Sequence, residues 1–145
     1  MSSEKDLALL NRGNIGFIVA AHGNMAASMV RVAEDMLGQK IGMTPFEFLA
    51  EEKFDVSLAR LRKLIQRQNQ GRGVIVLADL FGGTPGTMAF SMLETGSLEV
   101  VTGVNLPMVI AAAEIKADMD LADAAQKIKQ AGKSAIKQAG ELLGN

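Results

Sequence analysis

The chain has 145 residues, a formal net charge of -1 at pH 7 and no cysteine. Its length suits one domain with a core of its own, its charge excludes the broad basic surface of a nucleic-acid-binding protein, and the lack of cysteine excludes disulfides and thiolate metal sites. Because the chain starts with polar and acidic residues instead of a secretion signal, and has no apolar run of the roughly 18 residues that a membrane span needs, we expect a cytoplasmic protein.

The first expected strand leads to the only histidine in the chain. Residues 1–13 contain few apolar residues, so we expect a flexible N-terminal arm followed by a single domain over residues 14–145. The apolar run over residues 15–21 has the composition of a strand that is buried on both faces. It ends at His22, and a helical pattern follows over residues 24–37. His22 therefore lies at a junction between a strand and a helix.

The middle of the chain alternates in the same way. Residues 43–49 predict a second strand, and Pro45 within it indicates an edge position because proline cannot donate to a neighbouring strand. Asp55 is placed to cap a helix over residues 56–68. A third strand is expected over residues 74–78, where the run is again fully apolar. One further strand and helix unit, followed by a third strand, is therefore expected before the second half of the chain.

The second half repeats this order. Thr84 followed by Pro85 has the arrangement of an N-cap and a first helical residue, and predicts a helix over residues 85–94. A strand is then expected over residues 98–102, followed by a short helix that ends near residue 115. A last helix is expected to begin after Asp118 or Asp120, with an alanine-rich inner face that extends to Ala139.

This alternation predicts a doubly wound α/β fold, a mainly parallel four-stranded sheet in the order 2-1-3-4 with helices on both faces. In such sheets, ligands bind beyond the carboxyl ends of the strands, at the point where the strand order reverses. His22 follows the first strand and Asp79 follows the third. The topology therefore predicts that these two side chains share one crevice, with Asp79 orienting His22.

The residue types in this crevice limit its chemistry. A single histidine without cysteine excludes a metal site built from these residues, and no serine stands at a strand end to form a triad with His22. A carboxylate bonded to one nitrogen of the imidazole leaves the other nitrogen free to attack. The run Gly82-Gly83-Thr84-Pro85 offers open backbone N–H groups and a helix N-terminus, which suit a phosphoryl group.

A structural interpretation stands beside the functional one. A lone histidine is more often structural than catalytic, and an aspartate after a strand is often only a turn former. The occurrence of both at matching strand ends, next to a glycine loop, favours the functional interpretation.

Three stretches of the chain resemble signature stretches of the IIA component of the mannose-type bacterial sugar phosphotransferase system, the mannose/fructose/sorbose family. They are Gly-Phe-Ile-Val-Ala-Ala-His-Gly at residues 16–23, Ala-Asp-Leu-Phe-Gly-Gly-Thr-Pro at 78–85 and Val-Val-Thr-Gly-Val-Asn-Leu-Pro-Met at 100–108. The resemblance implies a phosphotransferase that accepts a phosphoryl group from the phosphorylated histidine-containing carrier protein and passes it to a IIB component for sugar uptake. It also implies a homodimer, with an extra strand shared between subunits, and no cofactor.

The resemblance also implies residue roles. His22 matches the histidine that is phosphorylated through Nε2, Asp79 the aspartate that holds its other nitrogen, and Thr84 a hydroxyl residue that helps to receive the phosphoryl group. Gly23, Gly82 and Gly83 would form the phosphoryl-binding loop. Two alternatives remain open, a regulatory module whose binding partner is switched by phosphorylation of His22, and a flavodoxin-like domain that binds an anion without covalent chemistry.

Overall fold

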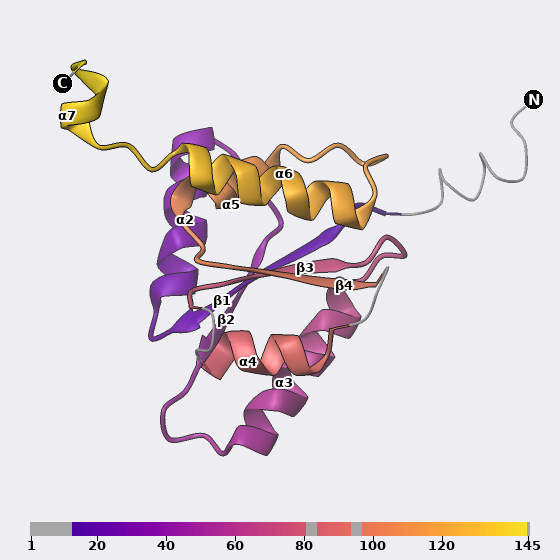
Figure 1. Ribbon diagram of the computed structural model, residues 1–145. Helices are drawn as coiled ribbons and strands as arrows, with labels where there is room; N and C mark the ends of the chain where they lie inside the picture. The colour runs from indigo at the N-terminus through magenta and orange to yellow at the C-terminus, as the bar shows by residue number, and fades with distance from the viewer. Residues whose placement is uncertain (1–12, 81–83, 94–96, 145) are drawn as a thin grey trace, which may run out of the picture.

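Four parallel strands form the centre of the protein (Figure 1). The computed structural model describes residues 13–80, 84–93 and 97–144. The strands are β1 (Gly16–His22), β2 (Thr44–Phe48), β3 (Val74–Ala78) and β4 (Leu98–Thr102). Their order in the sheet is β2-β1-β3-β4, and each neighbouring pair is parallel. The predicted doubly wound sheet is thus confirmed, and the proline-containing strand β2 lies at an edge as expected.

Helices cover both faces of this sheet (Figure 1). One face carries α2 (Met25–Leu37), α5 (Leu106–Ala113) and α6 (Leu121–Ser134), and the other carries α3 (Phe54–Gln68) and α4 (Thr84–Ser91). A short last helix, α7 (Ala139–Leu142), stands away from these layers and has no buried residue. None of the helices within the described ranges is long and apolar enough to span a membrane.

The double covering explains why the central strands are apolar at every position. In β1, Val19 and Ala21 pack into the core beneath α2, α5 and α6. Their neighbours Ile18 and Ala20 pack into the second core beneath α3 and α4. All four are fully buried, because side chains of a strand alternate between the two faces of the sheet. By the same alternation, His22 belongs to the face that α3 and α4 cover.

The helices α3 and α4 differ at their ends from the sequence predictions. The helix α3 begins at Phe54 after Lys53, so Asp55 lies in its first turn and is not its cap. A carboxylate in the first turn still interacts favourably with the helix dipole. The helix α4 begins at Thr84, which is thus a helical residue, and ends at Ser91. Thr95 and Gly96, which were expected to close this helix, lie outside the described residues.

The end of the chain shows a third difference. Asp120 caps α6, since its side chain accepts a hydrogen bond from the backbone N–H of Asp123 at 2.8 Å. The helix ends at Ser134, so the predicted inner face does not extend to Ala139, which belongs to α7. Residues 135–144 are all exposed. A helix in water depends mostly on packing of one face, and here the helix stops where burial stops.

Candidate active site

The carboxyl ends of β1 and β3 bring His22 and Asp79 together. The two strands pair in register from Gly16 with Val74 to Ala20 with Ala78. The backbone N–H of Asp79 then donates to the carbonyl of Ala20 at 3.1 Å, which extends the pairing by one residue. Nδ1 of His22 lies 2.7 Å from Oδ2 of Asp79. The predicted juxtaposition of these two side chains is therefore present in the structure.

The carboxylate of Asp79 accepts three hydrogen bonds. Oδ2 accepts from the backbone N–H of His22 at 3.1 Å as well as from the imidazole, and Oδ1 accepts from the backbone N–H of Leu80 at 2.9 Å. An ionised carboxylate can only accept, so Nδ1 of His22 carries the proton in this bond. Nε2 of the neutral ring then holds the free lone pair, and this nitrogen can act as a nucleophile or a base.

The environment keeps Asp79 ionised. Burial raises the pKa of its carboxyl, but the hydrogen bonds from the ring and backbone of His22, with that from Leu80, outweigh burial and leave the pKa below its ordinary value. The Asp79 side chain is 9% exposed, against 44% for His22. The site thus consists of a shielded carboxylate that holds an accessible imidazole.

We expect the stabilising contribution of Asp79 to disappear in acid. Because its pKa is lower in the folded chain, ionised Asp79 stabilises the fold fully above about pH 3.9, the ordinary value for aspartate, and this contribution is lost as the pH falls through the folded value. The difference in the free energy of unfolding between the native protein and D79N should therefore be larger at about pH 5 than at about pH 3. Urea unfolding at several pH values measures it, and a difference that persists unchanged to about pH 3 would contradict the role of the ionised form.

Phe48 completes the surroundings of the imidazole. It is the last residue of β2 and lies opposite His22 in the register of the two strands. The rings meet edge to face, with centroids 5.8 Å apart and an interplanar angle of 70°. This contact was not predicted from the sequence. The available signal was the spacing of Phe46 and Phe48, which places both on one face of an edge strand.

The remaining predicted site residues lie nearby in the chain but are not all described. Gly23 follows His22 with a φ of +59°, in the left-handed region that favours glycine. Thr84 is half-buried at the start of α4. Among the described residues, no hydrogen bond joins its side chain to His22 or Asp79. Gly82 and Gly83 lie outside the described residues.

Within the described ranges, no group of three or more histidine, cysteine, aspartate or glutamate side chains is placed to hold a metal ion. The chemistry available to the described residues is that of a single imidazole held by a carboxylate.

The fold and site define a class of protein, a doubly wound α/β domain with an accessible histidine at the switch point of the sheet. A family model described as the fructose IIA component of the phosphotransferase system, EIIA-man, matches residues 16–129. The chain belongs to this family. It is thus a IIA component of the mannose/fructose type of sugar phosphotransferase system.

Individual relatives agree with this placement. The mannose-specific EIIAB component of Escherichia coli (strain K12) is 26% identical over 97 residues, which cover 66% of this chain and 30% of that protein. The chain thus spans about a third of the length of that relative. The fructose-specific EIIA component of Bacillus subtilis (strain 168) is 22% identical over 130 residues, or 89% of each protein. The mannose/sorbose-specific IIA subunit of Enterococcus faecalis has a solved structure with a TM-score of 0.77 and 29% identity, and the match covers 87% of this chain and 95% of that one.

Proposed function

We propose that His22 accepts a phosphoryl group from the phosphorylated histidine-containing carrier protein and passes it to a IIB component for sugar uptake. The observation that carries this proposal is the bond between Nδ1 of His22 and the ionised carboxylate of Asp79. Membership of the EIIA-man family supports the type of reaction.

In the forward step, Nε2 of His22 attacks the phosphorus atom. A new N–P bond forms, the N–P bond to the histidine of the carrier protein breaks, and the leaving nitrogen keeps the electron pair. The proton on Nδ1 stays in place throughout. As Nε2 gives up its lone pair, positive charge develops on the imidazole, and the carboxylate of Asp79 stabilises that charge at 2.7 Å.

The phosphoryl oxygens need hydrogen-bond donors while charge is spread over them in the transition state. The N-terminus of α2 begins at Met25, three residues after His22, and the side chain of Asn24 makes no capping hydrogen bond there. We infer that N–H groups at this helix end and the hydroxyl of Thr84 receive the oxygens, together with Gly23, Gly82 and Gly83. No cofactor takes part in this scheme.

The onward step is the reverse reaction with a second partner. The IIB component attacks the phosphorus of phosphorylated His22, and Nε2 leaves with its electron pair. Because the first step breaks the N–P bond of one phosphohistidine and forms that of another, it is nearly balanced in free energy, and His22 can act as a carrier. We also propose that the protein acts in the cytoplasm as a homodimer, in line with the resemblance to its family.

The proposal predicts that the protein gains the mass of one phosphoryl group when it is incubated with phosphoenolpyruvate, the first enzyme of the phosphotransferase system and the carrier protein. The gain should be acid-labile and absent from H22A. Intact-mass spectrometry measures it, and no gain in a folded protein beside an active carrier would overturn the proposal. A gain that is never passed to any IIB component would instead indicate the regulatory module.

A further inference from the structure

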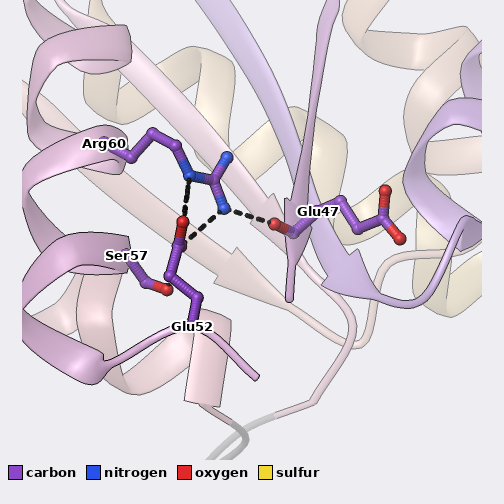
Figure 2. A network of polar contacts seen from close by, with 4 residues as sticks. All are labelled: Glu47, Glu52, Ser57 and Arg60. Carbon is purple, nitrogen blue, oxygen red and sulfur yellow. Dashed lines mark hydrogen bonds and ion pairs between the residues drawn. The ribbon is translucent and has the colours of Figure 1, made fainter. Parts of the chain in front are cut away.

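Four residues form a polar network where β2 ends and α3 begins (Figure 2). The guanidinium of Arg60 donates from Nε to both carboxylate oxygens of Glu52, at 3.2 and 3.3 Å, and from Nη2 to Oε1 at 3.0 Å. Nη2 also donates to the backbone carbonyl of Glu47 at 2.7 Å. The hydroxyl of Ser57 donates to Oε1 of Glu52. Arg60 therefore ties a helix to the end of the neighbouring strand and to the loop between them.

The network is anchored in the core. Ser57 is fully buried, and Phe46 is 1% exposed. The guanidinium carbon of Arg60 lies 4.4 Å from the centroid of the Phe46 ring, within the range of a cation–π contact. The hydrogen bonds from Arg60 and Ser57 hold the pKa of Glu52 below its ordinary value. Arg60 is thus held on one side by an aromatic ring and on the other by an ionised carboxylate.

The part of the strand that Arg60 holds is the part that contacts His22. Among the strands that the structure describes, β2 lies at the edge of the sheet and pairs with β1 alone. Glu47, whose carbonyl accepts the bond from Arg60, directly precedes Phe48. Phe48 pairs with His22 in the register and packs against its ring. The guanidinium of Arg60 is therefore linked to the imidazole through Glu47 and Phe48.

We propose that Arg60 is a positioning residue for His22. By fixing the end of the edge strand, it keeps the ring of Phe48 against the imidazole and limits the orientations that the imidazole can adopt about its bond to Asp79. The consequence for catalysis rests on the proposed function, because only a reacting His22 needs a fixed direction for Nε2. The consequence for the ring itself does not depend on that function.

The first test uses nuclear magnetic resonance of the unphosphorylated protein. His22 is the only histidine, so its ring signals can be assigned without ambiguity. We expect F48L to shift these signals by removing the neighbouring ring, and R60M to shift them in the same direction. R60K, which keeps the charge but not the planar fork of donors, should give a smaller shift. R62M, at an exposed position on the same helix, should give none.

The second test is the rate of phosphoryl acceptance. We expect R60M to lower it about tenfold, because small displacements of a reacting group reduce rates strongly, and R62M to leave it unchanged. A folded R60M protein with His22 signals and an acceptance rate like those of the native protein would overturn the inference. If R60M does not fold, the E52Q variant provides the test, because it removes the negative charge of the carboxylate that binds the Arg60 guanidinium. E52Q should shift the His22 signals, and unchanged signals would overturn the inference.

The two tests separate this inference from the proposed function. Shifted His22 signals in R60M, with no phosphorylation of the native protein, would leave the positioning role in place and remove the transfer reaction. If the native protein is phosphorylated but R60M has unchanged His22 signals and an unchanged acceptance rate, the transfer reaction stands and the positioning role of Arg60 is ruled out.

Discussion

Replacing Asp79 with asparagine (D79N) should lower the rate of phosphoryl acceptance by about 10²- to 10⁴-fold, in line with the loss when an amide replaces a carboxylate that orients a catalytic histidine. The bonds at Asp79 explain the size of the effect. Oδ2 faces two N–H groups of His22, and Oδ1 faces that of Leu80. An asparagine has a single oxygen, so in either orientation its NH2 group points at an N–H donor.

The amide would also change the imidazole. With the oxygen toward Leu80, the NH2 group would face Nδ1 of His22 and favour the tautomer that carries its proton on Nε2. That tautomer has no lone pair with which Nε2 can attack. With the oxygen toward His22, the tautomer is kept, but the negative charge that stabilises the developing imidazolium is absent. Both orientations slow the reaction.

Single-turnover transfer from the phosphorylated carrier protein measures this rate. D35N is a suitable control, because Asp35 is an exposed carboxylate on α2 and its replacement removes the same charge elsewhere. D35N should react like the native protein. A folded D79N protein that reacts within about twofold of the native rate would contradict the assigned role of Asp79.

Replacing Gly16 with alanine (G16A) should lower the free energy of unfolding by about 3 kcal/mol, at the upper end of the usual cost of overpacking. A Cβ at this position would lie 2.3 Å from the carbonyl oxygen of Gln68, the last residue of α3. This atom belongs to the backbone, so it cannot move aside as a flexible side chain would. The start of β1 and the end of α3 would have to separate.

Urea denaturation measures the effect on G16A. The matched control is G140A in α7, where a Cβ meets nothing within 4 Å, and the same chemical change should alter stability by less than about 0.5 kcal/mol. The total stability of a domain of this kind is about 5–15 kcal/mol, so the loss in G16A is readily resolved. Equal stabilities of G16A and G140A would show that the close approach of β1 to α3 is not a constraint.

The sequence predicted the sheet and the pairing of His22 with Asp79 because both depend on local patterns. The apolar runs of β3 and β4 end at the residues where these strands end in the structure. Once strands and helices alternate, parallel pairing follows, and the ends of the first and third strands become neighbours. These steps require no knowledge of individual side-chain contacts.

What the sequence could not predict depends on packing between distant elements. The spacing of Glu52 and Arg60 does not show whether the two side chains pair with each other or are separately solvated. The basic residues of α3 likewise do not reveal the contact between Arg60 and Phe46. Gly16 looked like any glycine in an apolar run. The end of α6 at Ser134 could not be predicted for a related reason. Alanine favours a helix whether or not there is a surface to pack against.

The central claim is that Nε2 of His22 carries the phosphoryl group while Asp79 holds Nδ1. Phosphorus and nitrogen magnetic resonance of the phosphorylated, nitrogen-15-labelled protein tests it directly, because the chain has a single histidine. We predict coupling between the phosphorus and Nε2, with Nδ1 still protonated. A phosphoryl group on Nδ1, or on any residue other than His22, would contradict the claim.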